Sequence, residues 1–142
     1  MQKETFIKQY AAGLNPQQLA AVQAVHGPVL LLAVPGSGKT TVLVTRLGYM
    51  VLCCDVPPAQ ILTMTYTVAA THEMRGRFAA RFGAELAGQM TFRTINGLSA
   101  VILQYYSRVY GRRQPELLTN EGDITRMLTD IWQQVSREFP TE

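Results

Sequence analysis

Short apolar runs along this chain alternate with stretches in which apolar residues recur every three or four positions. The runs have the length of β-strands and cover residues 29–33, 61–66 and about 90–94. Residues 29–33 include no polar side chain, which predicts a strand buried on both faces of a sheet. Because strands that alternate with helices usually lie parallel, the pattern predicts a doubly wound α/β fold.

A helical pattern follows each of these strands. The first runs from Lys39 to about Cys53, and Pro57 and Pro58 stop it. The next two carry apolar residues at the spacing of a helix face. Those residues are Ala70, Met74, Phe78 and Phe82 in one helix, and Leu98, Ile102, Tyr105 and Val109 in the other, which ends near Gly111.

Two more helices lie outside this alternation. Asn15 and Pro16 have the chemistry of an N-cap and a first-turn proline, and Leu19, Val22 and Val25 continue the helical spacing. Beyond residue 111 the sequence turns acidic, and a last helix is predicted there with no strand after it. Its apolar residues are Ile124, Leu128, Ile131 and Val135.

A glycine-rich turn between the first predicted strand and its helix carries the strongest chemical signal. Ala33-Val34-Pro35-Gly36-Ser37-Gly38-Lys39-Thr40 fits the Walker A pattern, with Ala in place of the first glycine. Gly36 and Gly38 permit the torsions of a phosphate-binding loop, and N–H groups at a helix start attract a polyphosphate. Lys39 would contact the outer phosphates, and the Thr40 hydroxyl would bind magnesium. The alternative is a tight turn without a ligand.

Positive charge is concentrated in the middle of the chain. The formal net charge of the 142 residues is only +3, but residues 75–113 contain seven arginines and one acid, whereas residues 116–142 carry a net charge of −4. A basic stretch is compatible with phosphate-rich partners such as nucleic acids. It is equally compatible with a solvated helix face, so charge alone does not decide between them.

Composition favours a folded domain over a disordered chain, since 47% of the residues are apolar and 16% are charged. The length of 142 residues leaves room for only the beginning of a second domain. No apolar run approaches the roughly 18 residues that span a bilayer, so we expect a cytoplasmic protein with no membrane partner.

The two cysteines, Cys53 and Cys54, are neighbours, and no zinc-ligand spacing occurs. Asp55 and Asp130 are interpreted as a helix-end acid and a solvated one, so neither is a predicted magnesium ligand.

Three segments, in this order, resemble motifs of the UvrD/Rep/PcrA-type superfamily-one DNA helicases. Residues 14–22, with the sequence LNPQQLAAV, resemble the family's Q motif, which lies just ahead of Walker A. The resemblance implies that Gln18 reads adenine, because a carboxamide pairs with the amino group and the ring nitrogen of that base. Gln18 also lies three residues after Asn15, where it would close a capping box, and both roles stay open.

The other two segments resemble the family's single-stranded DNA contacts. Residues 65–75 resemble motif Ia, in which Tyr66 would stack on a base. Residues 94–98 resemble the next motif, with Asn96 at the position of the usual histidine. The alternatives are a Tyr66 packed in the core and an Asn96 that caps the following helix.

The resemblance implies an incomplete RecA-like P-loop fold, in which helices flank a parallel sheet and a helical segment follows. Residues 1–111 would form part of the ATP-binding domain, and residues 112–142 would begin a helical insertion domain. The implied ATP site consists of Gln18, Ala33, Val34, Pro35, Gly36, Ser37, Gly38, Lys39, Thr40 and Thr41, with Lys39 and Thr40 catalytic and Thr40 binding magnesium. The implied DNA contacts are Thr65, Tyr66, Thr67, Thr94 and Asn96.

The implied function is that of the N-terminal part of an ATP-dependent DNA helicase, which uses ATP and magnesium to move along single-stranded DNA with 3′-to-5′ polarity. Its implied partners are single-stranded or partly duplex DNA and the remainder of the helicase, including a second RecA-like domain. Because such motors close two RecA-like domains around ATP, we expect the chain alone to bind ATP weakly and to turn it over negligibly.

Two other functions stay open. A small P-loop kinase or GTPase would use the same loop, but the sequence has no Asn-Lys-x-Asp run to read guanine. A non-catalytic nucleic-acid-binding module with a relic P-loop is favoured by Val68, Ala69 and Asn96, which replace a polar residue, a cation and a histidine of the family pattern. Preferential binding of GTP tests the first alternative, and salt-dependent DNA binding tests the second.

Overall fold

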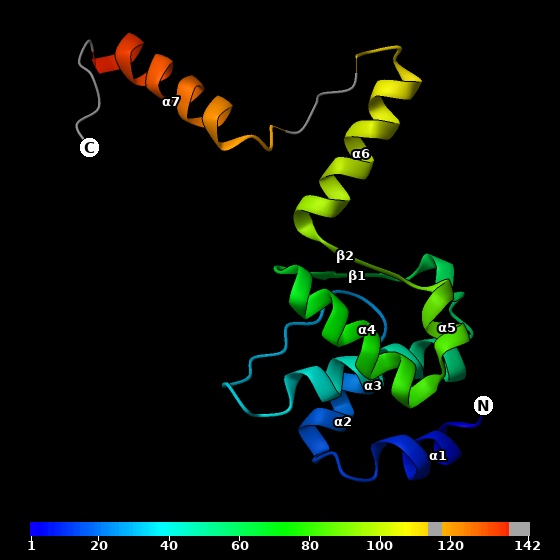
Figure 1. The fold of residues 1–142 in the computed structure, drawn as a ribbon. Coiled ribbons are helices and arrows are strands. Elements are labelled where there is room, and N and C mark those ends of the chain that lie inside the picture. Colours follow the sequence, from blue (N-terminus) through cyan, green and yellow to red (C-terminus); the bar gives the residue numbers. More distant parts are fainter. Residues whose placement is uncertain (114–117, 137–142) are drawn as a thin grey trace. The chain divides into compact units, whose positions relative to one another are not determined.

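The computed structural model describes residues 1–113 and 118–136 of the chain. It divides into two compact units, Met1–Ser99 and a second one that begins at Ala100. In chain order the elements are α1 (Lys3–Phe6), the π-helical turn η1 (Ile7–Ala11), α2 (Pro16–Gln23), α3 (Lys39–Cys53), the 3-10 turn η2 (Pro58–Gln60), β1 (Leu62–Thr65), α4 (Val68–Phe82), α5 (Ala84–Gln89), β2 (Thr91–Thr94), α6 (Ile95–Val109) and α7 (Glu121–Ser136) (Figure 1).

The sheet of the first unit has two strands, β1 and β2, which run parallel. Leu62 is the Cα partner of Thr91, and Thr65 is that of Thr94, so both strands end at the same edge. Parallel neighbours need a crossover connection, and α4 with α5 supplies it (Figure 1). This parallel pair and its helical crossover confirm the corresponding part of the predicted α/β pattern.

Residues 29–33, predicted as a strand buried on both faces, do not form a strand. A strand is defined by its ladder, and these residues have no ladder partner within residues 1–113 and 118–136. Leu31 packs against the helices, whereas Leu30 and Leu32 are each 83% exposed. The prediction was wrong because an apolar run indicates a preference for burial and does not by itself supply the neighbouring strands.

Two apolar clusters form the core of the first unit. The larger cluster confirms the predicted stripe of α4, since Met74 and Phe78 are its buried members from that helix. The second ties α1 and α2 to α3, and fully buried Phe6 anchors α1, an element that the sequence pattern did not predict. The buried residues are Val44, Ile61, Met74, Phe78, Ala87 and Met90 in the first cluster and Phe6, Val22, Val42 and Tyr49 in the second.

The C-terminal end of α3 carries two free thiols, Cys53 and Cys54. Burial is the main reason that the pKa of the Cys53 thiol is raised, which keeps this thiol protonated at neutral pH. Asp55 follows the helix in a left-handed conformation, with φ of 51°, which confirms its interpretation as a helix-end acid. No group of three or more His, Cys, Asp or Glu residues that could hold a metal ion occurs among the described residues.

Helices α3 and α4 approach closely at Gly48, where a Cβ atom would overlap the ring of Phe82. In an open helix, alanine is favoured over glycine by about 1 kcal/mol. Here the ring belongs to an aromatic cluster with Phe78 and Tyr10, and overpacking such a cluster costs about 1–3 kcal/mol. We therefore expect Gly48→Ala to lower the free energy of unfolding, measured by urea denaturation.

The matched control for this substitution is Gly76→Ala in α4. A Cβ atom added to Gly76 would have no neighbouring atom within 4 Å. There the helix preference acts alone, so Gly76→Ala is expected to raise the free energy of unfolding by about 0.5–1 kcal/mol. If both substitutions stabilised the chain equally, the close packing of α3 on α4 at Gly48 would be wrong.

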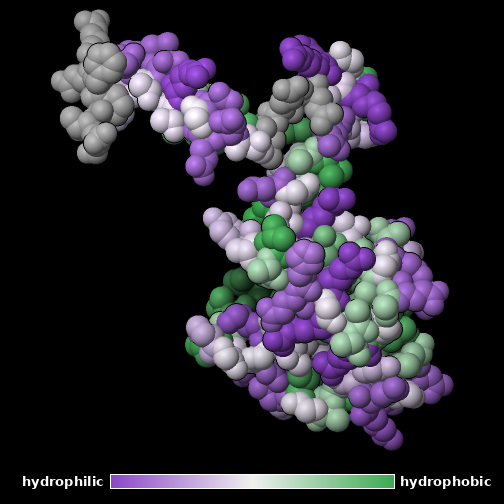
Figure 2. All heavy atoms as spheres, viewed as in Figure 1, coloured by the Kyte–Doolittle hydropathy of each residue, from purple (hydrophilic) through white to green (hydrophobic). Residues whose placement is uncertain are grey.

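Helices α6 and α7 confirm the two helices predicted for the C-terminal part. Their apolar stripes are exposed, since Ile102 of α6 is 57% exposed and Val135 of α7 is 82% exposed. Figure 2 shows hydrophobic residues at the surface of the α6 region as well as over the first unit. Asp130 is exposed on α7, as predicted. In the part of the chain that the structure describes, no helix is long and apolar enough for a membrane span.

Candidate functional site

The glycine-rich loop leads directly into α3. Gly36 and Gly38 adopt left-handed torsions, with φ of 79° and 80°, which glycine tolerates and other residues rarely adopt. The N–H and the hydroxyl of Ser37 both donate to the carbonyl of Val34, at 3.2 and 2.7 Å, and these bonds close the turn. The two glycines therefore let the chain turn back tightly just before the helix begins.

The start of α3 presents backbone donors without helical acceptors. Gly38 is the N-cap residue, and its end of the helix has no side-chain cap. The Val42 N–H donates to the Gly38 carbonyl at 3.0 Å, so the N–H groups of Lys39, Thr40 and Thr41 precede the first intrahelical bond. Such donors, together with the positive end of the helix dipole, favour an anion.

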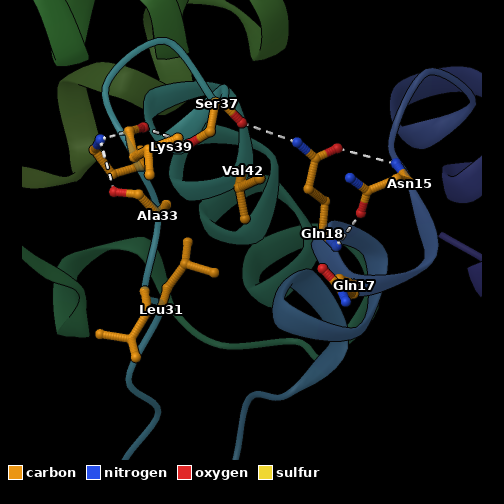
Figure 3. Close-up of a pocket in the computed structure, with 10 residues that line it drawn as sticks. Asn15, Gln17, Gln18, Leu31, Ala33, Ser37, Lys39 and Val42 are labelled. Carbon is orange, nitrogen blue, oxygen red and sulfur yellow. Dashed lines mark hydrogen bonds between the residues drawn. The ribbon is translucent and has the colours of Figure 1, made fainter.

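Lys39 folds back over the loop. Its ammonium donates to the carbonyls of Ala33 and Val34, at 3.2 and 2.9 Å (Figure 3). A positive charge is thus held within the loop, next to the unbonded N–H groups at the head of α3. Because the Lys39 side chain is exposed and long, its ammonium can exchange these carbonyls for the oxygens of a bound anion.

Both ends of the Gln18 carboxamide are hydrogen-bonded. Its Oε1 accepts from the Asn15 N–H at 2.9 Å, while Asn15 Oδ1 accepts from the Gln18 N–H at 2.8 Å, so the predicted capping box of α2 is confirmed. Its Nε2 donates to the Ser37 carbonyl at 3.0 Å, which links α2 to the loop (Figure 3). The reading of adenine by Gln18 stays a prediction.

A hollow of about 290 Å³ lies beside the loop. Gln17, Gln18 and Lys39 are among the polar residues that line it, and Leu31 and Val42 are among the apolar ones (Figure 3). A hollow that combines apolar walls with a few converging polar groups is typical of small-ligand sites. Its position places any occupant against both the Lys39 ammonium and the Gln18 carboxamide.

The predicted DNA contacts come together at the edge where β1 and β2 end. Thr65 and Thr94 are Cα partners in the sheet, so the register brings the two motif segments side by side. Tyr66 directly follows β1 and is 88% exposed. The alternative of a core-packed Tyr66 is therefore wrong, and its ring is available to a ligand.

The threonine hydroxyls of these segments cap helices. The Thr67 hydroxyl accepts from the Ala70 N–H at 3.1 Å as the N-cap of α4. The Thr94 hydroxyl accepts from the Gly97 N–H at 3.0 Å at the start of α6. Asn96 lies inside the first turn of α6, so the alternative in which Asn96 caps this helix is wrong.

Two features of the structure were not predicted from the sequence. One is the bond from Gln18 to the Ser37 carbonyl, for which a backbone acceptor leaves no signal in the residue types. The other is a hollow of about 230 Å³ between α4 and the end of β2, whose lining includes His72, Arg75 and Arg93. The spacing of His72 and Arg75 places them on one helix face, but the sheet register is needed to bring Arg93 to them.

A family model and individual relatives point to the same family of proteins. The family model described as the UvrD/REP helicase N-terminal domain matches residues 14–142. The chain is 40% identical over 92 residues to the ATP-dependent DNA helicase PcrA of Leuconostoc citreum, 36% identical over 119 residues to UvrD1 of Mycobacterium leprae, and 30% identical over 118 residues to Rep of Salmonella typhimurium.

The matched segments cover most of this chain and a small part of each relative. They span 65%, 84% and 83% of the chain for PcrA, UvrD1 and Rep, but only 12%, 15% and 18% of those helicases. The similarity therefore concerns the N-terminal domain to which the family model refers.

Proposed function

Since the chain belongs to the UvrD/REP helicase N-terminal domain family, we propose that it is the ATP-binding N-terminal part of an ATP-dependent DNA helicase. The observation that carries this proposal is the head of α3, where two left-handed glycines, unbonded N–H groups and the Lys39 ammonium come together. This donor set suits the triphosphate of a nucleotide. In the proposal the fold is a RecA-like P-loop fold, to which β1, β2 and their helices belong.

Lys39, Thr40 and Gln18 each have a defined task in this proposal. Lys39 leaves the carbonyls of Ala33 and Val34 and binds the outer phosphates, while the N–H groups at the helix start hold their oxygens. The Thr40 hydroxyl, in the first turn of α3, is the group that would hold magnesium, which neutralises phosphate charge when bound. Gln18 exchanges the Ser37 carbonyl for the edge of adenine.

The activity proposed for the whole protein is ATP hydrolysis coupled to movement along single-stranded DNA, with 3′-to-5′ polarity. A second RecA-like domain would close over the nucleotide, and the protein would work on single-stranded or partly duplex DNA in the cytoplasm. Residues 1–111 would be part of the ATP-binding domain, and residues 112–142 the start of a helical insertion. Of the latter, 114–117 and 137–142 lie outside the described residues.

Nucleotide titration of the 142-residue chain tests this function. We expect magnesium-dependent binding of ATP that is at least about fivefold tighter than binding of GTP, since a bidentate contact to a base contributes roughly 1–3 kcal/mol of discrimination. Calorimetry measures both affinities, and a phosphate-release assay is expected to detect negligible turnover. Gln18→Ala should reduce the preference for ATP. Tighter binding of GTP would favour the GTPase alternative, and absence of nucleotide binding would favour the relic-loop module.

A further inference from the structure

We propose that Arg46 is a positioning residue, which holds α2 in place so that Gln18 can pair with adenine. The inference rests on the proposed function and adds a determinant of base preference outside the predicted ATP site. Arg46 lies in the middle of α3, and its side chain is half-buried. Its Nη1 donates to the Ala21 carbonyl of α2 at 2.7 Å.

The Ala21 carbonyl lies at the C-terminal end of α2, where a helix leaves its last carbonyls without internal partners. If α2 continued, this carbonyl would accept from the Val25 N–H, but that N–H donates to the Gln23 carbonyl at 2.9 Å. The chain leaves the helix at Ala24, whose ψ of 78° is not helical. A cation at this end also interacts favourably with the negative pole of the helix dipole. The Arg46 guanidinium therefore caps α2.

Two hydrogen bonds fasten α2 to the segment that carries the loop, in the part of the chain that the structure describes. At one end of the helix Gln18 Nε2 donates to the Ser37 carbonyl at 3.0 Å, and at the other the Ala21 carbonyl accepts from Arg46. A helix of only eight residues is not stable in water by itself, so its position depends on such attachments. Gln18 and Arg46 thus hold the two ends of α2.

One face of α3 connects Arg46 to the nucleotide hollow. Lys39, Val42 and Arg46 follow each other on this face at three- and four-residue spacing. Val42 lines both the hollow beside the loop and a neighbouring hollow of about 130 Å³, which Ala21 and Arg46 also line. Arg46 is not among the described residues that line the first hollow. It would therefore act on a nucleotide through α2 and not by contact.

Binding of adenine would make the Arg46 bond more important. In the proposed complex Gln18 exchanges the Ser37 carbonyl for the base, and of the two bonds only that from Arg46 still fastens α2. A contact changes the affinity for a ligand only if it acts differently in the free and the bound state, and this one would. Among residues 1–113 and 118–136, no acid lies within ion-pair distance of Arg46 to compete with the Ala21 carbonyl.

Calorimetric titration of the 142-residue chain with three ligands, each with magnesium, tests this role. ATP and GTP differ in the base, and inorganic tripolyphosphate has no base. We expect Arg46→Met, which keeps an apolar side chain of similar length, to weaken binding of ATP by about two- to tenfold, the effect of having to order one long side chain. Affinities for GTP and tripolyphosphate should not change, because neither depends on pairing of Gln18 with adenine.

Three further variants make the result specific. Arg46→Lys keeps a cation that can cap α2, so it should retain the preference for ATP over GTP. Arg77→Met is the matched control, since it makes the same substitution at an exposed arginine of α4 that is paired with Glu73, and all three affinities should stay unchanged. Adding Arg46→Met to Gln18→Ala should weaken ATP binding no further, because both act through one contact.

A merely structural role of Arg46 gives a different pattern. Arg46→Met would then weaken binding of all three ligands equally, or lower the free energy of unfolding while the preference for ATP over GTP stays the same. Either result overturns the proposal. Additive losses of ATP affinity in the double variant with Gln18→Ala would also overturn it, because the two residues would then act independently.

Nuclear magnetic resonance of the unmodified chain gives a readout that needs no substitution. When ATP binds, the Gln18 side-chain amide signal should shift, while the Arg46 guanidinium protons stay protected from exchange with water. Rapid exchange of these protons in the ATP complex would refute the positioning role, even if Arg46→Met did not fold. Absence of ATP binding by the unmodified chain would refute the proposed function. A Gln18 amide signal that is the same in Arg46→Met and in the unmodified chain, both without nucleotide, would refute the positioning role alone.

Discussion

Replacing Lys39 with alanine is expected to weaken ATP binding by roughly 10- to 100-fold. The ammonium is the only side-chain cation that lines the hollow beside the loop in the described part of the chain. Hydrogen bonds to a charged group contribute about 1.5–3 kcal/mol each, and 1.4 kcal/mol corresponds to a tenfold change in affinity. The loss of even one such bond to a phosphate oxygen therefore gives a measurable effect in a calorimetric titration.

The control for Lys39→Ala is Lys8→Ala, which removes an equal charge from an exposed position in η1. Affinity for ATP should not change in this variant, because long-range attraction between exposed charges is largely screened at physiological salt. An affinity of Lys39→Ala within twofold of the unmodified chain would rule out phosphate binding by the loop ammonium. The hollow beside α2 would then need another ligand.

Replacing Phe78 with alanine is expected to lower the free energy of unfolding by about 3–5 kcal/mol, the range for truncating a buried ring. Phe78 is fully buried in the larger core cluster and lies 5.0 Å from Phe82 and 6.1 Å from Phe92, ring centre to ring centre. The ring joins α4 both to the aromatic cluster and to β2. Urea denaturation followed by circular dichroism measures the change.

Tyr66→Ala is the matched control for this substitution, since it removes an aromatic ring that is 88% exposed. The free energy of unfolding should then stay within about 0.5 kcal/mol, as is usual for surface substitutions. A loss of stability for Tyr66→Ala as large as that for Phe78→Ala would show that the ring of Tyr66 packs against the protein.

The elements that could be predicted from the sequence are those whose signals are local. The bounds of α3 follow from the glycine turn before it and the prolines after it, and the start of α2 follows from Asn15 and Pro16. Residues 29–33 show the limit of such signals, because a strand depends on partners elsewhere in the chain. The burial of α1 was also unpredictable, since the cavity that receives Phe6 is assembled from α2 and α3.

The candidate site shows the same difference between features set by a local motif and features that depend on distant parts of the chain. The left-handed glycines and the position of Lys39 at the head of a helix could be predicted, because one contiguous motif specifies them. The bond between Gln18 and the Ser37 carbonyl could not, since it joins two segments through a backbone atom. Arg93 was missed for a related reason: only the pairing of β1 with β2 shows which helix face it lies beside.

The unpaired backbone of residues 29–33 has a thermodynamic consequence for the loop that it enters. The packed helix α3 holds the C-terminal end of the loop, whereas no ladder bonds hold its N-terminal end within the described residues. Fixing one backbone residue costs about 1–2 kcal/mol of conformational entropy. A ligand that orders the N-terminal end of the loop must offset that cost from its own contacts. The same loop would therefore bind ATP more tightly with residues 29–33 paired in a sheet, through preorganisation and without any new contact to the nucleotide.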